Sequence, residues 1–294
     1  MPIANVAAAL VVWMKMITDI RTKSSSLTQR LLVIIILLPV GIGLVILGGI
    51  YFDFFLTLIL AVSAWEYVQL ATKGGYRPAQ WLVVGGTAVM ALSRSFMQFQ
   101  YADLIISVII LIAITVHLLD YEKGRDNAGT DFAITLGGIF YIGWLGSYMI
   151  SVRALPNGLW WFMLALPAAW LADSGAYLIG SRFGKRKFSP RISPRKTWEG
   201  YVGGIVFGTL CTIGITLIWS LRMPSLTWAH GLIMGLVMSI ITPLGDLGES
   251  IFKRQVGAKD SSNIIPGHGG VFDRIDSWLW AGVIGYYLIS LLWL

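Results

Sequence analysis

The sequence is poor in cysteine, histidine and charged residues, and each shortage excludes a class of protein. Its single cysteine, Cys211, excludes an intramolecular disulfide and any metal cluster held by cysteines alone. The chain has 3 histidines, and a lone one such as His268 cannot form a zinc site without nearby partners. Charged residues make up 13% of the 294 residues and hydrophobic residues 56%, more than a water-soluble core of this length needs to bury.

Long apolar runs are what the chain has instead. The mean hydropathy is +0.73, and the 13 Trp and 33 Gly also point to lipid as the solvent for much of the surface. Because a helix needs about 20 apolar residues to cross a bilayer, we predict an all-α polytopic integral membrane protein with about nine transmembrane helices. The predicted spans are 31–50, 52–71, 79–93, 102–120, 131–151, 158–180, 200–221, 229–245 and 278–294. The letters "TPLGD" predict a break at the end of the eighth.

The first 30 residues precede these runs. The letters "MPIANVAAALVVWMKMITDI" at their start are apolar enough to resemble a signal peptide, but they lack a charged segment beyond the amino group, and Lys15 interrupts them. We predict an interfacial N-terminal helix in residues 1–30, with a short additional span as the alternative. Because no internal repeat or low-complexity tract is found, residues 31–294 are predicted to form a single transmembrane domain.

Basic residues are distributed unevenly between the two sides of these spans. With nine spans and a cytoplasmic N-terminus, 19 of the 22 basic residues fall on the cytoplasmic side, and the opposite side keeps Arg94, Arg153 and Arg222. Such a bias is typical of cytoplasmic loops, so we predict an N-terminus inside and a C-terminus outside. A count lower by two adjacent spans would preserve much of this bias. With this orientation, the net charge of +7 predicts a basic cytoplasmic face, which is suited to binding anionic lipid or a polyphosphate. Nucleic acid is not expected, since no binding module accompanies the charge.

Three polar clusters lie at the predicted cytoplasmic ends of late spans. The first is Asp173 in "WLADSGAYLIG", within the sixth apolar run. A carboxylate at membrane depth is costly unless it is paired or hydrated, so we expect it to face a polar cavity. The alternative is an Asp that is hydrogen-bonded to a neighbouring helix.

The second cluster is "SPRISPRKTWEG", residues 189–200. Ser193 or Thr197 is placed to cap the helix that follows, which would leave free backbone N–H groups beside Arg195 and Lys196. This arrangement predicts a phosphate-binding segment. The alternative is an ordinary helix cap in a basic loop that membrane orientation requires anyway.

The third cluster, residues 243–277, is the most polar stretch of the chain. Asp246, Glu249 and Lys253 share one helical face, and Asp273 and Asp276 share another at the start of the last span. Magnesium prefers a few carboxylate oxygens together with substrate phosphates and water, so these faces predict a metal site. A solvated loop with paired surface charges is the alternative.

At these residues the chain resembles the phosphatidate cytidylyltransferases, also called CDP-diacylglycerol synthases. The blocks "DSGAYLIGSRFGK" and "SPRKTWEG" are similar to two further blocks of that family, and "WEY" in the second span resembles its usual pattern there. Many members have Lys where this chain has Arg195, which keeps the charge and should still bind phosphate. The residues that match the family signature without insertion are Ser250, Phe252, Lys253, Arg254, Lys259, Asp260, Ser262, Ile265, Pro266, His268, Gly269, Gly270, Val271, Asp273, Arg274, Ile275 and Asp276.

The resemblance implies transfer of the cytidylyl group of CTP to phosphatidate, which gives CDP-diacylglycerol and pyrophosphate. It implies a site at the cytoplasmic face of a bacterial inner membrane, in segments 173–200 and 246–277, with Mg²⁺ as cofactor. A second metal, a monovalent cation and a homodimer are left open. By resemblance, Asp246 and Asp273 are assigned as metal ligands. The catalytic candidates are Asp246, Asp273, Asp276, Lys259 and Arg274, and the substrate-binding candidates are Ser193, Arg195, Lys196, Thr197, Lys253, Arg254, His268 and Asp173.

Two other functions would explain part of this pattern. A transporter would be expected to carry polar residues near the bilayer midplane, often in two similar halves, whereas here the charges gather at one face in the last third. A CDP-alcohol phosphotransferase would share the metal and nucleotide chemistry, but its repeated Asp motif with an "AR" dipeptide is not found. Glu66 and His117 stay ambiguous between helix packing, a bundle cavity and the path of the lipid, with packing favoured for Glu66.

Overall fold

The computed structural model describes residues 26–265, 267 and 269–294, and most of them are helical. The predicted N-terminal helix in residues 1–30 lies almost wholly outside the described residues, and so does His268. The elements are α2 (Ser26–Leu47), α3 (Gly49–Lys73), α4 (Gln80–Met97), α5 (Ala102–Glu122), α6 (Ala128–Gly138), η1 (Ile139–Trp144), α7 (Leu145–Ala154), α8 (Gly158–Phe183), β1 (Lys187–Ser189), β2 (Ser193–Thr197), α9 (Trp198–Trp219), α10 (Trp228–Ile241), α11 (Pro243–Gln255) and α12 (Phe272–Leu292).

The all-α membrane architecture is confirmed, whereas the count of nine spans stays a prediction. Each of the nine predicted runs coincides with helical segments, and 131–151 and 229–245 each extend over more than one of them. The stretches that are long and apolar enough to cross a bilayer, among the described residues, number seven. They are Gly49–Lys73, Ala102–Glu122, Ala128–Ala154, Gly158–Phe183, Trp198–Trp219, Trp228–Gln255 and Phe272–Leu292. The other two predicted runs correspond to α2 and α4.

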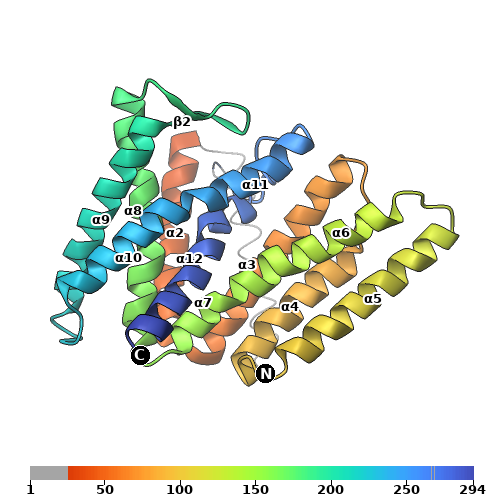
Figure 1. The fold of residues 1–294 in the computed structure, drawn as a ribbon, viewed down its shortest axis with the longest axis horizontal. Coiled ribbons are helices and arrows are strands. Elements are labelled where there is room, and N and C mark those ends of the chain that lie inside the picture. The colour runs from red at the N-terminus through yellow and green to blue at the C-terminus, as the bar shows by residue number, and fades with distance from the viewer. Residues whose placement is uncertain (1–25, 266, 268) are drawn as a thin grey trace.

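The helices run back and forth between two opposite edges of the molecule (Figure 1). In this view α8 and α9 lie on one side and α4 and α5 on the other, and α11 and the strands β1 and β2 lie toward the upper edge. Helix α12 is central, since it packs against α3, α7, α8, α10 and α11. Its position brings residues from several parts of the chain to one end of the bundle.

Glycines allow α8 and α9 to pack closely. A Cβ on Gly204 would lie 2.7 Å from the carbonyl oxygen of Ala172, and one on Gly200 would lie 2.8 Å from that of Ala176. Small residues at such positions let helix backbones approach in a membrane, where van der Waals contact and not hydrophobic burial drives association. The close approach fixes Asp173, next to Ala172, relative to the start of α9.

The predicted break in the eighth apolar run is confirmed. Helix α10 ends at Ile241 and α11 begins at Pro243, a residue favoured in the first turn because it lacks an N–H. The break changes the character of the chain. Helix α10 is apolar, whereas α11 carries Asp246, Glu249 and Lys253.

A two-stranded antiparallel hairpin, β1–β2, precedes α9 and was not predicted. Lys187 pairs with Thr197, and Ser189 pairs with Ser193. The strands are short, basic and interrupted by proline, so they lack the alternation that indicates a strand in sequence. The predicted helix after them is confirmed, and Thr197 is its N-cap, accepting a hydrogen bond from the Gly200 N–H at 3.2 Å.

Two of the three arginines predicted in outside loops lie instead in the last turns of helices. Arg94 lies in the last turn of α4 and is 3% exposed, with its guanidinium 3.4 Å from the centre of the Phe99 ring. Arg153 ends α7 and donates 2.8 Å and 3.2 Å hydrogen bonds to the carbonyls of Val45 and Ile46. The boundaries were placed wrongly because helices α4 and α7 extend past the apolar runs.

Candidate active site

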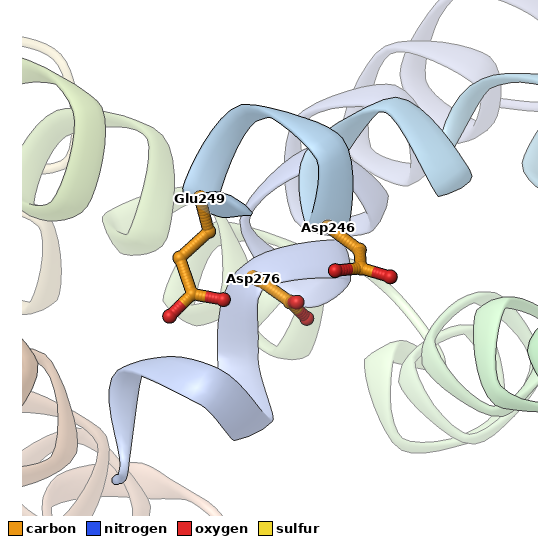
Figure 2. Close-up of side chains that lie close together, drawn as sticks. All are labelled: Asp246, Glu249 and Asp276. Carbon is orange, nitrogen blue, oxygen red and sulfur yellow. The ribbon is translucent and has the colours of Figure 1, made fainter. Parts of the chain in front are cut away.

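Three carboxylates from two helices lie together at the upper end of the bundle. Figure 2 shows Asp246 and Glu249, one turn apart on α11, beside Asp276 of α12. One oxygen from each lies within 4.8 Å of the others. Gly245 makes this possible, because a Cβ at that position would lie 2.7 Å from the Asp276 carbonyl oxygen. The absence of a side chain there lets the backbones of α11 and α12 meet.

This carboxylate trio suits a hard divalent cation. Its donors are all oxygens, the ligand type that Mg²⁺ prefers. Glu249 is fully buried, and its Oε1 has no hydrogen-bond partner among the described residues. A buried carboxylate oxygen without a partner is costly, and a cation held by Asp246, Glu249 and Asp276 would satisfy it.

Lys196 joins the hairpin to this site. Its Nζ lies 2.7 Å from Oδ2 of Asp246 and 3.5 Å from the Pro243 carbonyl oxygen. Lys196 is followed by Thr197, whose side chain caps α9. The hairpin therefore places the partly exposed ammonium group of Lys196 beside Asp246, a member of the trio.

Asp173 of α8 lies at the same end of the bundle. Its Oδ2 accepts a 3.5 Å hydrogen bond from the Ser277 hydroxyl, and its charge interacts with those of Lys196 and Asp246. The site therefore draws on α8, β2, α11 and α12. Its carboxyl groups, those of Asp173 and the trio, outnumber its lysine.

Lys253 and Asp273 form a buried pair next to the trio. Lys253 Nζ lies 2.7 Å from Glu249 Oε2 and 2.7 Å from Asp273 Oδ1. The other oxygen of Asp273 accepts hydrogen bonds from the N–H and hydroxyl of Ser261, both at 2.9 Å, and from the Gly270 N–H at 2.8 Å. Both carboxylate oxygens of Asp273 therefore have partners, one in Lys253 and the other in Ser261 and Gly270.

A comparison with protein families identifies the chain. The model of the cytidylyltransferase family matches residues 28–292, which includes every element that forms the site. The chain belongs to the cytidylyltransferase family.

Curated relatives of this cytidylyltransferase carry the printed name phosphatidate cytidylyltransferase. The one from Synechocystis sp. is 33% identical over 301 residues, covering 90% of this chain and 97% of that protein. The one from Pseudomonas aeruginosa is 35% identical over 257 residues, covering 85% and 92%. The one from Bacillus subtilis is 43% identical over 159 residues, covering 54% and 58%. Similarity to the first two therefore extends over nearly their whole length.

The structure brings some of the residues predicted for this cytidylyltransferase together and leaves others apart. Two predicted residues, Asp246 and Asp276, belong to the carboxylate trio. Next to it lie Lys196, Lys253 and Asp173, and Asp273 is connected to it through Lys253. Their roles in catalysis stay predictions. Other candidates are exposed at the surface, and within the described residues they form no ion pair: Arg195, Arg254, Lys259 and Arg274.

Arg254 has a contact that the sequence did not indicate. It donates hydrogen bonds to the carbonyls of Ile192 in the hairpin, at 3.1 Å, and of Ala258, at 3.0 Å. The guanidinium therefore connects the hairpin to the chain that follows α11. Ser193, the next residue after Ile192, begins β2.

Two further acidic residues lie in or near the candidate site, and neither was among the predicted site residues. Glu249 was noted on the face of Asp246 but was not assigned to the metal, although its spacing of three residues was a usable signal. Glu66 on α3 was favoured as a packing residue. The structure places it against residues 261–272, contacts that no local pattern around "WEY" could indicate.

Proposed function

We propose that this protein catalyses the transfer of the cytidylyl group of CTP to phosphatidate, forming CDP-diacylglycerol and pyrophosphate. Membership of the cytidylyltransferase family and relatives named for this reaction support the assignment. The observation that carries it is the carboxylate trio beside Lys196, at one end of a bundle of apolar helices. That is a place where a lipid phosphate and an aqueous nucleotide can meet.

In the proposed reaction a phosphate oxygen of phosphatidate attacks the α-phosphorus of CTP. The new P–O bond forms as the bond to the β-phosphate bridging oxygen breaks, and pyrophosphate leaves with that electron pair. Phosphatidate is a phosphate monoester and is already largely ionised near neutral pH. The protein therefore needs no strong base, and its task is to position two anionic substrates and offset their charge.

Asp246, Glu249 and Asp276 are proposed to hold Mg²⁺, with Asp273 supporting them through Lys253. The bound ion would supply positive charge to the phosphates as charge develops on the leaving group. Lys196 lies next to the trio and is proposed to bind a phosphate of CTP, helped by Arg195. The exposed cations Arg254, Lys259 and Arg274 are proposed to divide between nucleotide and lipid phosphate.

The site is proposed to face the cytoplasm from a bacterial inner membrane. The excess of basic residues on the predicted cytoplasmic side supports this orientation. The seven apolar helices and the bacterial relatives support an inner-membrane protein. CTP is made in the cytoplasm, so this orientation also gives the site its nucleotide.

The test follows labelled CTP into an organic-extractable lipid, using detergent-purified protein with and without phosphatidate and Mg²⁺. We expect labelled CDP-diacylglycerol only when both are present, together with one pyrophosphate per lipid formed. If lipid is labelled without added phosphatidate, the acceptor of the cytidylyl group is a different lipid. Folded protein that forms no labelled lipid with any divalent metal would refute the proposal.

A further inference from the structure

Glu66, near the end of α3, is fully buried and accepts four hydrogen bonds from a distant part of the chain. Its Oε1 accepts from the Ser262 hydroxyl at 2.5 Å and the Val271 N–H at 3.0 Å. Its Oε2 accepts from the Ser261 hydroxyl at 3.1 Å and the Phe272 N–H at 2.7 Å. Both oxygens of one carboxylate are therefore committed to residues 261–272.

Two of these donors are the first backbone N–H groups of α12. Val271 is the N-cap of that helix and Phe272 is its first residue, so their N–H groups have no partner within the helix. A carboxylate at a helix N-terminus also meets the positive end of the helix dipole. Glu66 thus supplies, from another helix, the cap that α12 does not supply for itself at these two positions.

Contacts around Gly270 link Glu66 to Asp273. The Ser261 hydroxyl lies between the two acids, 3.1 Å from Glu66 Oε2 and 2.9 Å from Asp273 Oδ2. A Cβ on Gly270 would overlap this hydroxyl and lie 2.6 Å from Glu66 Oε2. The glycine therefore leaves the space into which the carboxylate of α3 reaches.

We propose that Glu66 is a positioning residue for the active site. By fixing the N-terminus of α12, it sets the position of Asp273 against Lys253 and of Asp276 against Asp246. It touches no residue of the carboxylate trio, so its effect passes through α12 and residues 261–271. The predicted consequence for the rate rests on the proposed function, whereas the predicted consequence for the structure does not.

The variant that tests this is Glu66→Gln, which keeps the size of the side chain but replaces one acceptor oxygen with an NH₂ group. Whichever oxygen is replaced, the hydrogen bond from one backbone N–H of α12 is lost, because an NH₂ group cannot accept from a backbone N–H, whereas the serine hydroxyl beside it can turn to accept from the NH₂ group. The matched control is Asp131→Asn. Asp131 is also buried, and it also accepts from a backbone N–H, that of Arg77 at 2.8 Å, but it contacts Arg125 and no residue of the site.

Two measurements are made on both variants. Hydrogen exchange of purified protein should be faster in peptides covering residues 261–273 for Glu66→Gln and unchanged there for Asp131→Asn. In the labelled-CTP assay, kcat of Glu66→Gln should fall by about 10- to 100-fold, as expected for a misplacement of about 1 Å, with a smaller change in KM for CTP. Asp131→Asn should keep kcat near the wild-type value even if its thermal stability falls.

Three outcomes would overturn the proposal. One is unchanged exchange in residues 261–273 of Glu66→Gln, and another is a wild-type kcat. The third is an equal loss of kcat in Asp131→Asn, which would mean that any buried carboxylate gives the same effect through stability. If the wild-type protein makes no labelled lipid, the proposed function fails, and the exchange measurement still decides whether Glu66 holds the start of α12.

Discussion

Asp273 and Asp276 lie one turn apart on α12 and have different surroundings. Asp276 belongs to the carboxylate trio with Asp246 and Glu249. Asp273 pairs with Lys253 and accepts hydrogen bonds from Ser261 and Gly270. The sequence predicts both on one helical face, and the family resemblance assigns the metal to Asp246 and Asp273, which stays a prediction. Only the rotation of α12 against α11, which no local pattern encodes, decides which of them faces Asp246.

This difference predicts two kinds of variant. Asp276→Asn should raise the Mg²⁺ concentration for half-maximal turnover by about 10-fold or more, as expected when a metal-site group is lost. Asp273→Asn leaves Lys253 with one partner and removes half of a buried pair. It should lower the free energy of unfolding by about 3 kcal/mol or more.

Turnover against Mg²⁺ and thermal unfolding, measured on both variants, would separate these effects. Glu122 is an exposed acid at the end of α5, so the corresponding acid-to-amide variant Glu122→Gln serves as the control. It should alter neither the Mg²⁺ response nor the thermal stability. A weakened Mg²⁺ response in Asp273→Asn at wild-type stability, with a normal response in Asp276→Asn, would return the metal site to Asp273.

At the scale of elements, what was predicted and what was missed have a common physical reason. The break before Pro243 and the cap at Thr197 depend on a few neighbouring residues, and both were found in the sequence. The hairpin β1–β2 has no such local pattern. The contact of Glu66 with Phe272 joins positions 206 residues apart, so it depends on how whole helices pack.

The contact between α11 and α12 is the element-level feature on which the carboxylate trio depends. Gly245→Ala would place a Cβ 2.7 Å from the Asp276 carbonyl oxygen and 2.8 Å from the Trp280 ring, so the helices must move apart. We expect turnover to fall by about 10-fold or more, because a shift of about 1 Å at the reacting groups costs about 100-fold. The labelled-CTP assay measures this effect.

A matched glycine is available in α9. A Cβ on Gly214 would meet nothing within 4 Å. Gly214→Ala should therefore keep wild-type turnover and gain up to about 1 kcal/mol in helix propensity. Similar activity in the two variants would show that the α11–α12 contact tolerates displacement, contrary to the role given to Gly245.

At the scale of the whole molecule, the class of fold that the hydropathy pattern predicted is confirmed, and the number of spans stays a prediction. Helix α4 coincides with a predicted run, yet it is not among the seven long apolar stretches of the described chain. Hydropathy measures whether a segment tolerates lipid, and α4 carries the buried Arg94 among its apolar residues. Topology therefore needs evidence from the two sides of the membrane.

The proposed orientation predicts which positions are accessible from each side. Gln255, exposed at the end of α11, should face the cytoplasm, and Arg222, exposed between α9 and α10, should face the opposite side. The stretch Trp228–Gln255 is the single candidate span between them. Because the chain has one cysteine, Cys211→Ser gives a background in which each added thiol is labelled alone.

In that background, a membrane-impermeant maleimide should label Arg222→Cys in intact spheroplasts and Gln255→Cys only after the membrane is opened. Each variant is first checked for turnover, so that only folded protein is scored. The reverse pattern would place the carboxylate trio on the side that lacks CTP. Equal labelling of both positions in intact spheroplasts would mean that Trp228–Gln255 does not cross the bilayer, which would contradict the alternation of helices from which the basic cytoplasmic face was inferred.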